Sequence, residues 1–382
     1  MKEKSNIKEI MFGFIKNIIL GYLEWFLLNQ NTFILKGLKF LSFSKSALFL
    51  KEIVEPRLKE GEILVRVDAC GICGSDIGNI FGTSCKPTSK LGHEIIGTIE
   101  KITTNFDKDI FQCGTRVFVH HHASCKKCYY CIHGNETLCE NFVDSIYPCG
   151  ISEKIVIPKW IIETNSIFKL PDTLSPEEGI MIEPLACCLR GWNKVKIKKG
   201  DTVVIFGIGP IGMINALLGK MYGAGKIYCI DINEYRLGYC KTLKIGIPLN
   251  SRKNDIINKF GLSNNEYVDL IIIATADLSV LKDAVKIIRP GGIILIFGEP
   301  QMGNKINLCI SEIYSKEISF ITTYAASNKE INKAIELVNK KIIDVKKLVS
   351  HKFTLEESNK AIERVYLKKD TLKVMINNSK NE

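Results

Sequence analysis

The stretch Asp201–Gly212, with the sequence DTVVIFGIGPIG, decides the fold of the chain. Its first half is a continuous apolar run that predicts a buried strand, and residues 213–222 read as the helix that follows. A second strand-like run, 226–230, ends at Asp231, about 20 residues beyond the last glycine. Strand, glycine-rich turn, helix, strand and acid in this order predict a dinucleotide-binding βαβ unit.

The glycine-rich turn holds the residues that we expect to bind the dinucleotide. Gly207, Gly209 and Gly212 permit a tight turn and let backbone N–H groups approach a pyrophosphate at the N-terminus of a helix. Pro210 and Ile211 belong to the same turn.

Asp231 indicates which dinucleotide binds. A carboxylate at this position accepts hydrogen bonds from ribose hydroxyls and repels a 2′-phosphate, so we expect NAD rather than NADP. Strand-like and helix-like runs alternate from residue 269 to residue 323. This alternation predicts an α/β fold with a parallel, doubly wound sheet.

Residues 36–119 have a different pattern, in which short β-like runs are separated by turns. The clearest run, Glu62–Ala69, leads into Gly71-Ile72-Cys73-Gly74-Ser75-Asp76. A second run, 95–102, follows Gly92-His93-Glu94. These runs predict a β-rich domain in front of the dinucleotide-binding unit.

Cys73, His93 and a carboxylate from Glu94 or Glu183 suggest a catalytic metal site. A thiolate, an imidazole and a carboxylate suit Zn²⁺, and catalytic zinc sites use three protein ligands and keep one position open. Each residue alone is ordinary, and the interpretation depends on their joint occurrence.

Four cysteines with close spacing predict a second, separate metal site. Cys125, Cys128, Cys131 and Cys139 can wrap one Zn²⁺ tetrahedrally with every position filled. A closed site has no room for substrate, so we expect a structural role. The preceding run His120–His122 could supply ligands too, but we expect it to end a strand, because the four sulfurs complete the coordination.

Bulk properties narrow the class of protein. A chain of 382 residues suggests roughly two domains, and 46% hydrophobic with 24% charged residues is ordinary globular composition. The net charge of +11 is spread without long runs of one sign, so we expect no nucleic-acid partner. The remaining cysteines of the 14 are scattered, which favours the cytoplasm over a disulfide framework.

Residues 1–34 form an apolar extension that does not fit the enzyme pattern. The run Ile10–Leu28 is close to the length of a membrane span, but Lys16 and Glu24 make a spanning helix costly. No small-residue cleavage site follows it. A helix on a membrane surface is the alternative that we do not favour. We expect an appendage, with a natural start near Leu35.

Together the motifs resemble the zinc-containing medium-chain dehydrogenase/reductase family, from about Lys36 to the C-terminus. The likeness is greatest to the polyol (sorbitol or L-iditol) dehydrogenases, with L-threonine and butanediol dehydrogenases close behind. It implies a GroES-like catalytic domain (35–187 and 324–382) with an inserted Rossmann NAD-binding domain (188–323). It also implies a catalytic and a structural zinc, and oxidation of a secondary alcohol to a ketone by NAD.

The resemblance assigns further roles within the site. Cys73 and His93 would hold the zinc, while Glu94 and Glu183 compete for the third place. Asp76 would orient a ligand, and Ser75 would relay the proton of the alcohol. The residues that fall where the family contacts cofactor or substrate are Arg236, Thr275 and Tyr324.

The resemblance leads to two further points, one about the route of the substrate proton and one about the oligomeric state. Many relatives have a histidine where this chain has Gly78, so the proton route beyond Ser75 is open. Dimers or tetramers would form through the edge of the Rossmann sheet near Ile293–Phe297. A non-catalytic NAD- or zinc-binding protein is the alternative from a different class.

Overall fold

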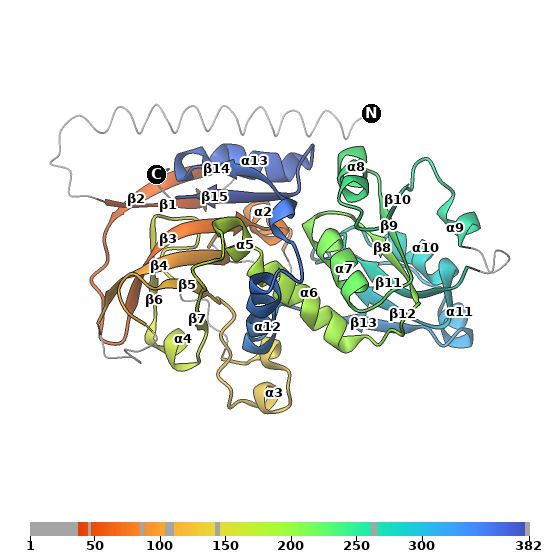
Figure 1. Ribbon diagram of the computed structural model, residues 1–382, viewed down its shortest axis with the longest axis horizontal. Coiled ribbons are helices and arrows are strands. Elements are labelled where there is room, and N and C mark those ends of the chain that lie inside the picture. The colour runs from red at the N-terminus through yellow and green to blue at the C-terminus, as the bar shows by residue number, and fades with distance from the viewer. Residues whose placement is uncertain are drawn as a thin grey trace.

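The computed structural model describes residues 37–378 except 45–46, 85–87, 89, 104–110, 142–145 and 261–265. The expected N-terminal extension, residues 1–34, lies outside the described residues. Two large sheets lie side by side along the long axis of the molecule (Figure 1). Within the described ranges, no helix is long and apolar enough to cross a membrane.

The first sheet is the β-rich part that the sequence predicts. It has seven strands, in the order β14-β15-β3-β4-β5-β7 with β6 paired to β3. All its pairs are antiparallel except β14 with β15. Its strands are β3 (Ile63–Ile72), β4 (Glu94–Ile102), β5 (Arg116–Val119), β6 (Lys154–Ile157), β7 (Ile167–Lys169), β14 (Val349–Phe353) and β15 (Lys373–Asn377).

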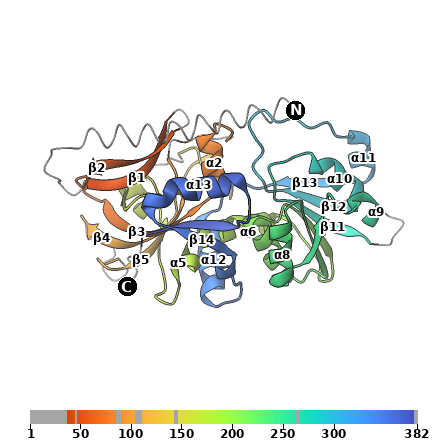
Figure 2. The ribbon, with the colours of Figure 1, turned by 90° about the horizontal axis from the view of Figure 1, so that it is seen from above.

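A hairpin precedes this sheet, and short helices connect and cover its strands. Helix α13 lies against α2 and β15 (Figure 2). The hairpin is β1 (Gly37–Ser44) with β2 (Ala47–Val54), and the helices are α2 (Gly74–Ile80), α3 (Tyr129–Ile132), α4 (Lys159–Glu163), α5 (Pro176–Gly179) and α13 (Ser358–Leu367).

The second sheet is parallel, as the alternation of strands and helices predicts. Its order is β10-β9-β8-β11-β12-β13. The first strand in the sequence, β8, therefore lies near the middle of the sheet, and later strands are added on both sides of it. The strands are β8 (Thr202–Phe206), β9 (Lys226–Asp231), β10 (Ile247–Asn250), β11 (Val268–Ile273), β12 (Ile288–Ile296) and β13 (Ser319–Thr322). The helices are α7 (Pro210–Met221), α8 (Glu234–Thr242), α9 (Ile256–Lys259), α10 (Val280–Ile287) and α11 (Ile310–Ser315).

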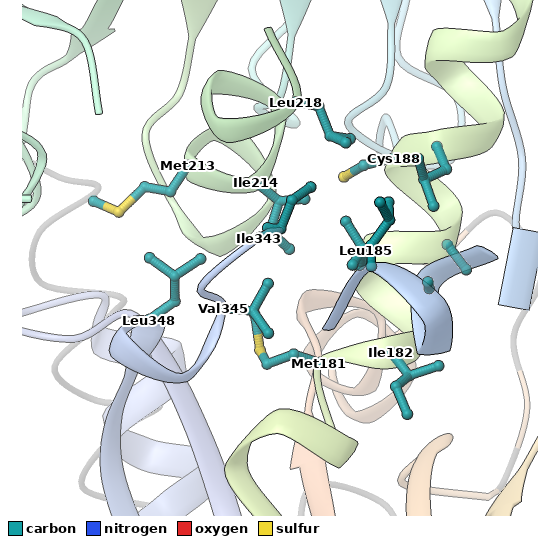
Figure 3. Close-up of a cluster of buried hydrophobic side chains, with 14 of the residues drawn as sticks. Met181, Ile182, Leu185, Cys188, Met213, Ile214, Leu218, Ile343, Val345 and Leu348 are labelled. Atoms are coloured by element: carbon teal, nitrogen blue, oxygen red, sulfur yellow. The ribbon is translucent and has the colours of Figure 1, made fainter. Parts of the chain in front are cut away.

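Helix α6 (Ile182–Lys194) connects the two sheets. Its apolar face packs on α7 of the parallel sheet and on the segment after α12 (Asn328–Asn339), as Figure 3 shows. Met181, Leu185 and Cys188 are fully buried in this cluster with Ile214 and Val345. Each buried aliphatic side chain contributes about 1.5–3 kcal/mol, so α6 fixes the two sheets relative to each other.

The start of α12 is tied to the antiparallel sheet by one side chain. Asn328 Nδ2 donates to the carbonyl oxygens of Thr164 and Asn165, each at 3.0 Å. Its Oδ1 accepts from Ser166 Oγ at 3.2 Å and lies 2.9 Å from Nδ1 of the buried His120. His120, which directly follows β5, is therefore held in place by its contact with Asn328.

We predict that Asn328→Ala lowers the free energy of unfolding by about 2 kcal/mol, because it leaves the buried His120 without its partner and removes two hydrogen bonds to backbone carbonyl groups. Urea denaturation measures the change. The control is Asn332→Ala, one turn further along an exposed face of α12, with an effect below about 0.5 kcal/mol. Equal effects of the two variants would contradict the role of Asn328.

Candidate catalytic metal centre and nucleotide cleft

Pairing of two antiparallel strands brings the first metal-binding group together. Cys73 follows β3, His93 precedes β4, and Gly71 lies opposite Glu94 in the ladder. One potential ligand atom each from Cys73, His93 and Glu94 lies within 4.8 Å of the others. The structure thus groups three of the residues that the sequence singled out.

The chain has no room for a side chain at Gly71. A Cβ atom there would collide with Glu94 Oε2, so only glycine lets the carboxylate of Glu94 lie across β3. Gly92 has a φ of +82° and turns the chain into His93. Small residues thus let β3 and β4 approach closely beside the metal-binding group.

Asp76 fixes the geometry around Cys73 and His93. Its buried carboxylate accepts from the backbone N–H of Cys73 and of Gly92, both at 2.8 Å. His93 Nδ1 lies 3.6 Å from Asp76 Oδ1. Burial by itself would raise the pKa of Asp76, but His93 and these two N–H groups lower it overall. Asp76 is therefore placed to orient the imidazole.

Lys373 on β15 is a partner of Glu94 that sequence reasoning missed. Its ammonium forms an ion pair with Glu94, and both side chains are almost completely buried, at 4% and 1% exposure. Lys373 Nζ also donates to the carbonyl oxygen of Ile72 at 3.2 Å. Burial raises the pKa of Glu94, and the positive charge of Lys373 opposes that shift. A single Lys among many near the C-terminus gave no signal of this role.

Glu183 enters the same region from the first turn of α6. It is buried, and Cys187 Sγ, one turn further along α6, donates to Glu183 Oε1 at 3.1 Å. Burial raises the pKa of Cys187, and the charges of Glu183 and Cys73 add to the shift. Glu183 likewise raises the pKa of Glu94. Both carboxylates that compete for the third ligand position therefore lie at this centre, with Glu94 inside the close group.

The run after β5 also reaches the metal-binding group. The ring of His121 lies 4.9 Å from the ring of His93, between centroids, and the ring of His122 lies 5.5 Å from that of Tyr324. Burial and the neighbouring imidazoles hold the pKa of His121 well below its usual range. The sequence predicted only that these histidines end a strand.

Ser75 and Gly78 lie on α2, next to Cys73. Ser75 is partly exposed in the first turn. The carbonyl oxygen of Gly78 accepts from the N–H groups of Thr83 and Ser84, at 2.8 and 3.2 Å. Ser84 Oγ in turn donates to Glu299 Oε1 of the parallel-sheet side at 3.0 Å. The carbonyl group of Gly78 thus supports a contact between the two halves of the molecule.

The second metal-binding group is the cluster of Cys125, Cys128, Cys131 and Cys139. The sulfur of Cys131 lies 3.5 Å from that of Cys128 and 4.0 Å from that of Cys125. Zn–S bonds of 2.3 Å in a tetrahedron place sulfurs about 3.8 Å apart, so the cluster fits Zn²⁺. A hydrogen bond from the backbone of Lys127 is the main cause that lowers the pKa of Cys125 to about 6, which favours the thiolate.

The glycine-rich turn has the geometry of a phosphate-binding loop. A Cβ at Gly207, where φ is +90°, would lie 2.9 Å from the carbonyl oxygen of Ala274. A Cβ at Gly212 would collide with the carbonyl oxygen of Gly207. Gly209 and Pro210 then begin α7, whose N-terminus faces outward from the carboxyl end of β8.

Asp231 is the last residue of β9 and holds the glycine-rich turn by a hydrogen bond. Its Oδ2 accepts from the N–H of Ile208 at 2.7 Å, and Oδ1 accepts from Ile232 and Asn233 at 2.7 and 2.9 Å. Arg236 lies 4.0 Å from Asp231 on α8. Asp231 therefore has a fixed orientation at the strand end.

Thr275 follows β11, the strand next to β8 in the parallel sheet. Its Oγ1 accepts from the N–H of Asp277 at 3.2 Å, and a Cβ at Gly298 would collide with its backbone. Thr275 and the glycine-rich turn thus share one edge of the parallel sheet, as the carboxyl ends of parallel strands must.

Comparison with known proteins places these features in a family. Residues 59–172 match the family described as alcohol dehydrogenase GroES-like domain, and residues 210–340 match zinc-binding dehydrogenase. Sorbitol dehydrogenase of Bacillus subtilis (strain 168) is 30% identical over 328 residues, covering 84% of this chain and 91% of that protein. L-idonate 5-dehydrogenase of Vitis vinifera is 27% identical over 345 residues, covering 86% and 92%.

Solved structures give the same result. An alcohol dehydrogenase of Escherichia coli CFT073, in complex with NADH, has a TM-score of 0.79 at 26% identity and covers 89% of this chain and 99% of that chain. The fold and the two metal-binding groups define a two-domain, zinc-type dehydrogenase. The chain belongs to the zinc-containing medium-chain dehydrogenase/reductase family. It is an oxidoreductase that acts on alcohols with NAD(P), and the predictions of family, fold class and enzyme class are confirmed.

We predict that Cys128→Ser lowers the zinc content from two ions per chain to one and lowers the melting temperature, because a structural zinc supplies folding free energy. Elemental analysis and thermal denaturation measure both effects. Cys113→Ser, which changes an exposed cysteine outside both groups, is the control and keeps two ions. Two zinc ions in the Cys128→Ser protein would refute a four-sulfur site.

We predict that Lys373→Met lowers the free energy of unfolding by about 3–5 kcal/mol, because it leaves the buried carboxylate of Glu94 unpaired. Lys352→Met is a matched control, since it breaks an ion pair with Glu177 in which the lysine is half exposed, worth at most about 1 kcal/mol. Urea denaturation compares them in a Cys73→Ser background, in which no zinc ion pairs with Glu94. Equal losses would mean that burial of the Lys373 pair has no energetic consequence.

Proposed function

We propose that this chain oxidises a secondary alcohol group of a polyol, such as sorbitol or L-iditol, to a ketone with NAD. The observation that carries the proposal is the group of Cys73, His93 and Glu94, with Glu183 beside it on the helix that joins the two sheets. Relatives named sorbitol dehydrogenase, D-xylulose reductase and L-idonate 5-dehydrogenase support a polyol as the substrate.

The residues present fit a catalytic zinc. Thiolate, imidazole and carboxylate form a suitable donor set, and Glu94 Oε2 is buried with no hydrogen-bond partner in the described part of the chain. Cys73 and His93 would hold the ion, with Glu94 or Glu183 as the third ligand. Zinc supplies a Lewis acid that lowers the pKa of the alcohol, and NAD supplies the hydride acceptor.

The surrounding residues position the candidate metal ligands and transfer the proton of the substrate hydroxyl. Asp76 holds His93 and the turn of Cys73 in one orientation, which a metal ligand requires. Cys187 fixes the carboxylate of Glu183. Ser75, two positions after Cys73, accepts the hydroxyl proton of the substrate while it passes its own hydroxyl proton on toward solvent.

The cofactor would lie along the carboxyl edge of the parallel sheet. Its pyrophosphate would meet the turn Gly207–Gly212 at the start of α7. Asp231 would accept from the adenosine ribose and disfavour a 2′-phosphate, with Arg236 beside it. Thr275 would contact the nicotinamide half. NAD rather than NADP follows from the carboxylate of Asp231.

The separation of the strands into two sheets supports a division of the chain into two domains. We assign residues 35–187 and 324–382 to the catalytic domain and residues 188–323 to the Rossmann domain. The predicted edge near Ile293–Phe297 is wrong, because β12 pairs on both sides, with β11 and with β13. The edge strand at that end of the sheet is β13, and its position supports pairing with a second copy in a homo-oligomer, a dimer or tetramer, in the cytoplasm.

Steady-state assays with sorbitol, xylitol, 2,3-butanediol and L-threonine, each with NAD and NADP, test the proposal. We expect NAD reduction with a polyol, and a loss of about 1,000-fold or more in kcat/KM for Cys73→Ser, because several kcal/mol of transition-state stabilisation disappear. Cys113→Ser serves as control. NAD reduction with threonine but with no polyol would overturn the substrate class. Unchanged activity of Cys73→Ser would overturn the catalytic site.

A further inference from the structure

The cysteine lobe, residues 125–141, exposes a cluster of large apolar side chains. Tyr129, Tyr130 and Ile132 come from α3, and Leu138 comes from the short 3₁₀ helix that follows it. All four are exposed, Tyr129 to 63% and Ile132 to 67%. Single apolar side chains on a protein surface are ordinary, whereas a contiguous apolar patch marks an interaction site. The lobe therefore has the composition of a surface that meets another molecule.

Contacts within the lobe hold this surface in one shape. The ring of Tyr129 lies 5.7 Å from that of Tyr130, edge to face, and 4.1 Å from that of His133, between centroids. Helix α3 packs on the following 3₁₀ helix. The four-cysteine group links the same two elements, because Cys131 lies in α3 and Cys139 directly follows the 3₁₀ helix. The patch is thus formed before any partner binds.

The charges of the lobe indicate which partner fits. The chain has a net charge of +11, so two copies repel each other wherever that charge prevails. The lobe itself carries two lysines and two glutamates and is therefore neutral: Lys126, Lys127, Glu136 and Glu140. A surface that carries both signs in equal number can complement an identical surface across a twofold axis. The lobe thus fits a second copy of itself.

The lobe is also separate from the other surface at which copies would meet. In Figure 1, α3 lies at the lower end of the molecule, away from β13 at the edge of the parallel sheet. Contacts at the lobe and at β13 would therefore use different surfaces of one chain. Two different twofold contacts on one chain close into a tetramer.

We propose that the cysteine lobe binds the cysteine lobe of a second copy of this chain. Tyr129 and Ile132 form the apolar centre of the contact, and Lys127 and Glu140 belong to its charged rim, which is the usual arrangement of an interface. The lobe contact stands independently of the polyol activity. The tetramer needs the pairing of β13 as well, and in this respect it rests on the proposed function.

Sedimentation velocity of the full, zinc-loaded chain tests the proposal. We expect four chains per particle for the wild type and two for Ile132→Glu, because the new carboxylate would lie in the apolar centre of the contact. Ile257→Glu, which changes an exposed isoleucine of α9, is the matched control and keeps four chains. Zinc content and NAD reduction stay at the wild-type level in Ile132→Glu, because Ile132 belongs to neither metal-binding group.

A charge exchange provides a second test that leaves the apolar centre intact. Lys127→Glu changes the net charge of the lobe from zero to −2, so we expect two chains per particle. Adding Glu140→Lys returns the lobe to zero and should restore four. The backbone N–H groups of Lys127 and Glu140 donate to the sulfurs of Cys125 and Cys128, and these bonds do not depend on the side chains. This pair of variants decides if Ile132→Glu loses zinc or does not fold.

The outcomes separate the lobe contact from the other proposals. A monomeric wild type, an unchanged number of chains in folded Ile132→Glu or in Lys127→Glu, or no recovery in the double variant would overturn the lobe contact. A wild type of two chains that separates in Ile132→Glu would support the lobe contact and contradict the pairing of β13. A protein that oxidises no polyol would overturn the proposed function while the lobe contact stands.

Discussion

The pairing of β3 with β4 and β15 is the constraint on which the catalytic centre depends. Cys73 directly follows β3, His93 directly precedes β4, and Glu94 begins β4, while Lys373 begins β15 on the other side of β3. Because Gly71 has no side chain, the carboxylate of Glu94 crosses the middle strand and meets the ammonium of Lys373. A buried charge pair is tolerated only in such a fixed geometry. The sheet register therefore determines the electrostatics of the site.

Helix α6 supplies the other half of the centre. Its first two turns present Glu183 and Cys187 to the metal-binding group, while Leu185 and Cys188 pack into the core that joins the two sheets. One helix thus sets both the position of a candidate ligand and the angle between the domains. A shift of the Rossmann domain would be transmitted to Glu183 through the packing of α6, since close-packed cores transmit strain.

Sequence reasoning succeeded where the chemistry is local. The glycine-rich turn and the four cysteines each lie within a short stretch, so spacing alone predicts the dinucleotide fold and the four-cysteine group, whereas the group of Cys73, His93 and Glu94 was predicted from the joint occurrence of residues in separate stretches. It missed contacts between distant residues. Glu94 and Lys373 are 279 positions apart, and only strand pairing reveals them as partners. It also undervalued His121 and His122, because the direction in which side chains leave the end of β5 depends on the neighbouring strands.

The discontinuous sheet has a consequence for biosynthesis. The strands of the parallel sheet lie in one continuous segment from Thr202 to Thr322, so that sheet can form while translation proceeds. β15 pairs with both β14 and β3 but is the last of the described strands to leave the ribosome. Until then Glu94 has no Lys373 beside it. Nascent chains would therefore complete their nucleotide-binding half first, and the metal centre would mature only after nearly all of the chain has been synthesised.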